Sequence, residues 1–156
     1  MKRLLLAFLL AAPLSTAWPR AGGGCFPAGT KIATIEGERP IEEIRPGDKV
    51  LAFTDGRLVR AEVKNSYEKK DRLLFLRTTK GRLTATPEQP LLTPTGFTEA
   101  RNLKKDVEVA MLADGRRVWV KITSVKTGGM AKVYNLEVAP PHTFIAGGFI
   151  VHNKGL

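Results

Sequence analysis

The C-terminal segment GGFIVHNKGL places His152 and Asn153 side by side after a short apolar run. An asparagine can close its side-chain nitrogen onto its own backbone carbonyl, which forms a succinimide and releases whatever follows, here Lys154. A histidine is the side chain best suited to carry a proton near neutral pH. The other histidine, His142, lies close enough in sequence to serve the same bond. The pattern predicts a chain that can cleave itself at this end. The alternative is a purely structural role, with Asn153 as a turn residue and His142 as an edge histidine.

Residues 1–17 have the pattern of a signal peptide, with two cations, an apolar stretch from Leu4 to Leu14 and then small residues ending at Ala17. We expect cleavage after Ala17 and a secreted or periplasmic protein. The apolar stretch is too short to span a bilayer comfortably, so we expect no stable membrane anchor.

Cys25 is the only cysteine. In an exported protein it forms no internal disulfide, so it is packing filler, an intermolecular bridge or a reactive thiol. It follows a flank, residues 18–24, that ends in three glycines, which we expect to be flexible and to let other groups approach the backbone closely. An activated thiolate could attack the Gly24 carbonyl and convert the amide into a thioester.

Composition bounds the remaining choices. A chain of 156 residues that is 43% hydrophobic and 26% charged is long enough for one domain with a core. The net charge is +10, but the sequence contains no run of five cations. We therefore interpret the charge as that of a solvated surface and expect no specific nucleic-acid binding. Charge-driven binding to nucleic acid or to an anionic cell surface stays open as an alternative.

The body of the chain reads as short β-strands. The runs are rich in β-branched and aromatic residues, and pairs such as TDGR and ADGR separate them as hairpin turns. The expected strands are TKIATI, PGDKVLAF, RLVRAEVKNSY, RLLFLRTT, RVWVKITSV and KVYNLEV. IEEIRPGD and TEARNLKK hold at most one or two helical turns, so we predict an all-β fold.

An internal repeat runs through these strands. Five residues recur 59 positions later, and they are Val50, Asp55, Gly56, Arg57 and Val59, matched by Val109, Asp114, Gly115, Arg116 and Val118. Two similar β units imply pseudo-two-fold symmetry. Such an arrangement could bring the two chain ends together and turn Cys25 and Asn153 into one site.

Three segments carry a resemblance to a known family. CFPAGTKIATIEGERPIEEIRPGDKVLAF at 25–53, TATPEQPLLT at 84–93 and VYNLEVAPPHTFIAGGFIVHN at 133–153 resemble the N-terminal, middle and C-terminal motifs of the Hint (Hedgehog/intein) domain. The resemblance covers residues 25–153 and leaves 154–156 as a tail. It implies a compact Hint-type fold and single-turnover autocatalytic peptide cleavage, as in bacterial intein-like or toxin-processing modules.

The resemblance also implies roles for six residues. Cys25 corresponds to the N-terminal nucleophile, Thr86 to a backbone-positioning residue and His142 to a proton carrier. His152 is the penultimate histidine and Asn153 the cyclising residue, while Gln89 stands where the family usually has a histidine. The implied substrate is the chain's own flanking segments, and we expect no cofactor, no bound metal and a monomer.

Three departures from the family's pattern shape the expected chemistry. Gln89 can donate a hydrogen bond but cannot shuttle a proton. Lys154 stands where splicing inteins have Ser, Thr or Cys, so ligation of the flanks has no obvious route. Asn135 occupies a position where many splicing inteins carry an aspartate. We therefore expect cleavage rather than splicing, with a catalytically degenerate binding or structural scaffold as the alternative.

Overall fold

The computed structural model describes residues 24–153. The expected leader at 1–17, the flank up to residue 23 and the tail at 154–156 lie outside the described residues. The elements are β1 Phe26–Pro27, β2 Lys31–Thr34, β3 Gly37–Pro40, η1 Ile41–Glu43, β4 Lys49–Thr54, β5 Arg57–Thr78, β6 Arg82–Ala85, β7 Pro90–Thr93, β8 Gly96–Glu99, η2 Ala100–Asn102, β9 Glu108–Ala113, β10 Arg116–Val138, β11 Thr143–Ala146 and β12 Phe149–His152. The all-β prediction is confirmed, and η1 and η2 are single 3-10 turns at the two places where helical turns were expected. Within 24–153, the structure contains no helix long and apolar enough to cross a membrane.

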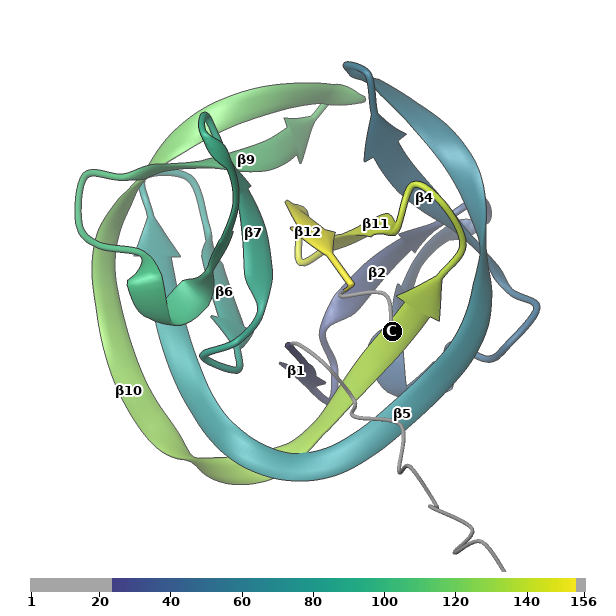
Figure 1. Ribbon diagram of the computed structural model, residues 1–156, viewed down its shortest axis with the longest axis horizontal. Coiled ribbons are helices and arrows are strands. Elements are labelled where there is room, and N and C mark those ends of the chain that lie inside the picture. The colour runs from purple at the N-terminus through teal and green to yellow at the C-terminus, as the bar shows by residue number, and fades with distance from the viewer. Residues whose placement is uncertain (1–23, 154–156) are drawn as a thin grey trace, which may run out of the picture.

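Two strands are far longer than the sequence pattern indicated. β5 has 22 residues and β10 has 23, and each joins two segments that the sequence presents as separate strands. The polar stretch Glu68–Asp71, which looks like a loop, continues β5 because it pairs with Ala131–Tyr134 of β10. The four β5 residues of this stretch are exposed or half-buried, so polar side chains are tolerated there. The ribbon curves around β1, β11 and β12 (Figure 1).

The predicted repeat extends to four successive elements of each half. β2, β3, η1 and β4 have counterparts in β7, β8, η2 and β9, each 59 positions later. Hydrogen bonds repeat as well: Ile41 N–H donates to Thr30 O at 2.8 Å, and Ala100 N–H donates to Gln89 O at 2.8 Å. Gln89 is therefore the counterpart of Thr30, and the same backbone hydrogen bond holds each of these two residues.

The C-terminal hairpin lies between the two halves. In the antiparallel sheet, β11 and β12 separate β2 of the first half from β7 of the second. All four residues of β11 are buried, and Phe144 packs edge-on against Phe26 at a ring separation of 6.0 Å. Because Phe26 directly follows Cys25, this aromatic pair helps to hold the beginning of the described chain at the centre, near its end (Figure 1).

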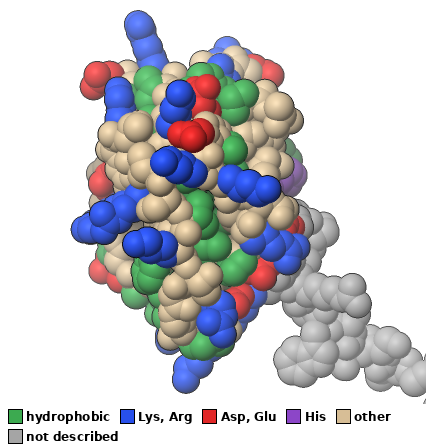
Figure 2. Space-filling view, turned by 90° about the vertical axis from the view of Figure 1, so that its left-hand side faces the viewer, with side chains coloured by type: hydrophobic (Ala, Val, Ile, Leu, Met, Phe, Trp, Pro, Cys, Tyr) green, Lys and Arg blue, Asp and Glu red, His purple; other side chains and the backbone are tan. Residues whose placement is uncertain are grey.

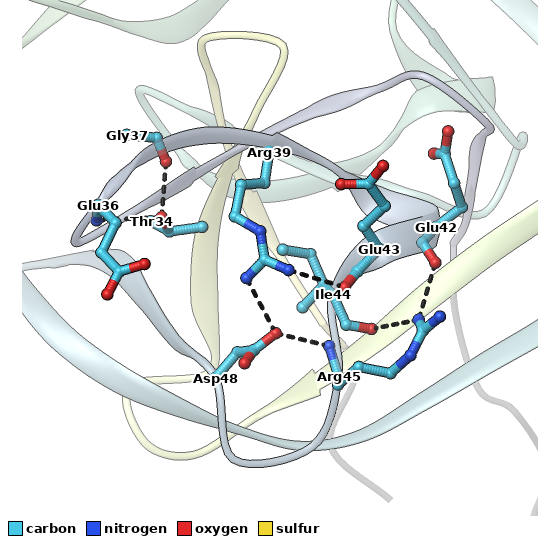
Figure 3. Close-up of polar contacts among 9 residues, drawn as sticks. All are labelled: Thr34, Glu36, Gly37, Arg39, Glu42, Glu43, Ile44, Arg45 and Asp48. Carbon is cyan, nitrogen blue, oxygen red and sulfur yellow. Dashed lines mark hydrogen bonds and ion pairs between the residues drawn. The ribbon is translucent and has the colours of Figure 1, made fainter.

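A polar network stiffens the segment that leads out of β1. Arg39 and Asp48 form an ion pair at 3.2 Å, and Asp48 also accepts the Arg45 N–H at 2.8 Å. Arg45 in turn donates to the Glu42 carbonyl at 2.8 Å (Figure 3). The Glu42 carboxylate accepts the Gly29 N–H at 2.7 Å, which ties η1 to the turn just after Cys25 and Phe26. The pair is half-exposed, so we attribute to it positioning of this turn more than stability.

The repeat makes a stability prediction at the two Asp-Gly turns. Gly56 and Gly115 have φ of 75° and 73°, and nothing lies within 4 Å of where a Cβ would stand. Gly56→Ala and Gly115→Ala should each lower the free energy of unfolding by about 1–2 kcal/mol, because only backbone strain is added. Urea unfolding measures both, and Gly129→Ala, which meets nothing and has no left-handed φ, should cost much less. Clearly unequal costs at the two turns would contradict equivalent halves.

Candidate active site

Cys25 and Thr86 are joined by two backbone-directed hydrogen bonds. The Cys25 N–H donates to Thr86 Oγ1 at 2.8 Å, and the Thr86 N–H donates to the Cys25 carbonyl at 2.9 Å. The Cys25 nitrogen belongs to the Gly24–Cys25 peptide bond, so Thr86 holds the amide that the thiol would attack. Both residues are buried, with Thr86 on the segment between β6 and β7. A buried N–H needs an acceptor, and the threonine hydroxyl supplies it.

Gln89 lies between the two ends of the domain. Its Nε2 donates to the His152 carbonyl at 3.1 Å and to the Pro90 carbonyl at 3.0 Å. On its other side it presses against Gly24, where an added Cβ would collide with the Cα, Cβ and Oε1 of Gln89. Gly24 has φ of 42°, so glycine is required there for space and for backbone conformation. One buried amide thus contacts the residue before Cys25 and the residue before Asn153.

Asn153 is buried and held by the segment that precedes β11. Its backbone N–H donates to the His142 carbonyl at 2.9 Å. In the hydrogen-bonded orientation of the amide, Nδ2 donates to the same carbonyl at 2.7 Å and Oδ1 accepts the Val138 N–H at 3.3 Å. His142 has a left-handed φ of 65°, uncommon for a residue with a side chain. The carboxamide that would cyclise is therefore fixed, and its orientation depends on the backbone of a predicted site residue.

The two histidine rings lie 6.1 Å apart. His142 Nδ1 is 2.9 Å from the Val138 carbonyl, which can only accept, so this nitrogen carries the hydrogen and Nε2 of the neutral ring is left as an acceptor. Burial, with a smaller effect from His142, lowers the pKa of His152 below its usual 6.5. His152 is thus neutral at neutral pH, and its ring also packs against Phe97 with centroids 4.9 Å apart.

His152 opens onto a cavity of about 370 Å³ whose other walls include Phe53, Leu92, Phe97 and Pro141. His142 is not among its lining residues. The cavity gives solvent or a peptide access to the residue next to Asn153. Among the described residues, no group of three or more His, Cys, Asp and Glu side chains is arranged to hold a metal.

The environment of the thiol opposes its activation. Burial raises the pKa of Cys25 to about 11, while the cation of Lys69 acts in the opposite direction. Lys69 is itself paired with Asp71 at 3.1 Å, and the carboxylates of Asp71 and Glu88 also favour the protonated thiol. Sequence reasoning missed these three charges because two of them lie in the polar stretch that looked like a loop. At neutral pH almost all of the thiol is protonated.

Asn135 lies beside the same end of the site. It is buried on β10, next to Tyr134, which pairs with Phe26 of β1. Cys25 precedes Phe26 and Asn135 follows Tyr134, so both residues lie next to the last paired residues of β1 and β10. Asn135 therefore places a neutral amide at this end of the site, where an aspartate would add a negative charge.

The fold brings all six predicted residues into one chain of contacts. Cys25 bonds to Thr86, and the Gln89 N–H donates to the Thr86 carbonyl at 3.1 Å. Gln89 reaches His152, and the neighbouring Asn153 bonds to His142. The ends, 128 residues apart in sequence from Cys25 to Asn153, are linked by these contacts. Cys25, Thr86, Gln89 and Asn153 are buried, and the two histidines are half-buried.

A family model described as the Pretoxin HINT domain matches residues 31–156. The chain belongs to the Pretoxin HINT domain family. The expected Hint resemblance is confirmed, although the matched residues begin after Cys25. No curated protein matches the sequence significantly.

Solved structures that are similar to this chain agree with its assignment to the Hint family. A bacterial intein-like domain from Clostridium thermocellum is 30% identical, with a TM-score of 0.74, and the alignment covers 83% of this chain and 98% of that one. A DnaB intein from Synechocystis sp. PCC 6803 has a TM-score of 0.79 at 23% identity, covering 85% and 99%. The gp41-1 intein has a TM-score of 0.74 at 24% identity, covering 84% and 99%. The two inteins show the same fold, and the chain covers nearly their whole length.

The charges around Cys25 predict the pH dependence of its alkylation. With a pKa of about 11, the thiolate fraction and the alkylation rate should rise with pH through the whole neutral and alkaline range. Lys69→Gln should lower the rate at a given pH by about two- to threefold, because a half-exposed cation that favours the thiolate is lost. Lys70→Gln, its exposed neighbour, should leave the rate unchanged. A plateau near neutral pH would contradict the raised pKa.

Proposed function

We propose that this Hint domain cleaves its own chain once, chiefly at the Asn153–Lys154 bond, with the Gly24–Cys25 bond as a second and slower site. The observation that carries the proposal is the contact of Gln89 with both Gly24 and the His152 carbonyl. The substrate is the pair of flanking segments. The signal-peptide pattern of residues 1–17 supports action outside the cytoplasm.

At the C-terminal end, Asn153 Nδ2 attacks the Asn153 carbonyl carbon. The bond to Lys154 breaks, one Nδ2 hydrogen ends on the Lys154 nitrogen, and a C-terminal succinimide remains. In this proposal neutral His152 and the acceptor Nε2 of His142 carry that proton. Both hydrogen bonds of the His142 carbonyl keep the asparagine near its attack geometry.

At the N-terminal end, Cys25 Sγ attacks the Gly24 carbonyl carbon. The peptide C–N bond breaks, a thioester forms, and the Cys25 nitrogen takes the thiol proton to become an amine. Water or an added thiol then releases the flank. Two features slow this half: the thiol has a pKa of about 11, and Gln89 offers only a neutral donor. These same features favour a second candidate, a Hint scaffold whose N-terminal chemistry has been lost.

Cleavage at Asn153 can be followed by intact mass. The purified protein, incubated near neutral pH, should lose residues 154–156 and gain the mass of a succinimide or its hydrolysis product. Asn153→Ala should abolish the loss, because alanine has no nucleophilic nitrogen, and His152→Ala should slow it by about 100-fold. Asn102→Ala, an exposed asparagine on η2, is the matched control and should cleave normally. An unchanged mass in the parent protein would leave only the scaffold.

Gln89→His tests the N-terminal half. An imidazole at this position could carry a proton, so thiol-induced release of residues 18–24 should rise by about 100-fold. Cys25→Ala in the same background should remove the gain. The rate is measured on a reporter fused in place of that segment, with and without dithiothreitol. If Gln89→His changes nothing while Cys25 can still be alkylated, the middle motif is not what limits this step.

A further inference from the structure

Positive charge is strongly segregated in this fold. Residues 72–87 and 115–136 together contain nine Lys and Arg and no Asp or Glu, whereas the rest of the sequence has 16 cations and 15 acids. The two stretches are partners in space, because β5 and β10 pair from Thr78 with Ile122 to Arg72 with Met130. Nearly all of the net charge of the sequence thus lies in these two stretches. Figure 2, which views the side that carries β10 and β6, shows more blue than red side chains.

We define the basic face by its six exposed cations, Arg72, Arg77, Lys80, Arg82, Lys121 and Lys126. The ion pairs of residues 24–153 all involve other cations, so none of these six charges is neutralised within the described fold. Arg72 donates one hydrogen bond, to the Gly128 carbonyl at 3.5 Å. The face therefore presents a concentrated positive field to solvent.

At the centre of the face, Arg77 and Arg82 stand directly opposite each other on β5 and β6. Like charges at such positions destabilise a sheet. Both arginines line a cavity of about 430 Å³ together with Thr78, Gly81 and Thr123. The Thr78 hydroxyl already donates to the Gly81 carbonyl at 2.8 Å, which leaves the two guanidinium groups and the Thr123 hydroxyl. This set of donors around an open cavity suits a phosphate group, which arginine binds with paired hydrogen bonds.

Exposed apolar side chains accompany these cations. Met130 and Phe75 are the most exposed large hydrophobic residues of the described chain, at 63% and 43%. Phe75 pairs with Lys126 across the strands, and Met130 pairs with Arg72. Cations that surround exposed apolar groups are typical of surfaces that rest in a lipid headgroup region. A surface for single-stranded nucleic acid would instead present several rings for stacking, and among the described residues the basic face has Phe75 alone, because the similarly exposed Phe97 lies on β8.

We propose that the basic face docks the domain on an anionic phospholipid surface. Arg77 and Arg82 hold lipid phosphates, the four other cations add attraction, and Phe75 and Met130 enter the headgroup region. This binding is peripheral and reversible. None of its residues belongs to the cleavage site, so it can hold or fail independently of the proposed function.

Sedimentation with vesicles tests the proposal, using the chain from Trp18 onward, which contains every described strand and the whole core. The protein should sediment with vesicles of phosphatidylglycerol and phosphatidylcholine, remain free with pure phosphatidylcholine, and be released by added salt. The double variant Arg77→Gln, Arg82→Gln should bind about 30-fold more weakly. The matched control Arg57→Gln, Arg60→Gln removes the same charge from the start of β5 and should weaken binding by only about threefold.

Met130→Ser isolates the apolar contribution and should weaken vesicle binding by about fivefold without changing the charge. The urea midpoint of each variant confirms that it is folded. Equal losses in the two double-arginine variants would overturn the proposal in favour of generic net charge. If a single-stranded oligonucleotide binds more tightly than the vesicles and Met130→Ser has no effect on either, the face is a nucleic-acid surface and the lipid assignment is wrong.

Discussion

The burial of the Gly24–Cys25 peptide is the constraint on which the site depends. A peptide N–H taken out of water requires an acceptor, and Thr86 Oγ1 provides it at 2.8 Å. The same short segment places Gln89 three residues later, against Gly24 and the His152 carbonyl. Because this segment is held by the backbone of β6 and β7, the positions of both chain ends are set by one rigid connection.

The duplicated frame explains why the ends meet at the centre. Each half builds the same hairpin, 3-10 turn and hairpin, and the long ribbon of β5 and β10 surrounds both. β11 and β12 then fill the space between β2 and β7, and their side chains complete the core. Gln89 is the counterpart of Thr30 in the repeat. Of these two equivalent positions, Gln89 is the one that contacts the C-terminal strand, through the His152 carbonyl. A symmetric frame thus carries an asymmetric site.

Burial has opposite consequences for the two proposed reactions. It raises the pKa of Cys25, which keeps the thiol protonated and less nucleophilic. It lowers the pKa of His152, which keeps the imidazole neutral and able to accept a proton. Asparagine cyclisation needs no ionised nucleophile, so a dry environment with fixed hydrogen bonds hinders it less. The same low-dielectric interior therefore favours the C-terminal reaction over the N-terminal one.

The sequence by itself determined the all-β character, the repeat and the six candidate residues. Alternation, Asp-Gly turns and the residues recurring at a spacing of 59 are local or periodic signals, and the TATPEQP and VHN segments resemble the family's motifs in their residue types. It misjudged β5 and β10, because Glu68–Asp71 is polar like a loop and becomes a strand only when β10 pairs with it.

Only the tertiary structure decided the environment of the site and the distribution of charge. Lys69 and Asp71 approach Cys25 because the ribbon curves, and nothing in their spacing from Cys25 indicates this. No run of five cations exists, yet the pairing of β5 with β6 and β10 brings the six scattered cations of the basic face into one region of the sheet. Such effects depend on distance through space and on burial, which a linear pattern does not contain.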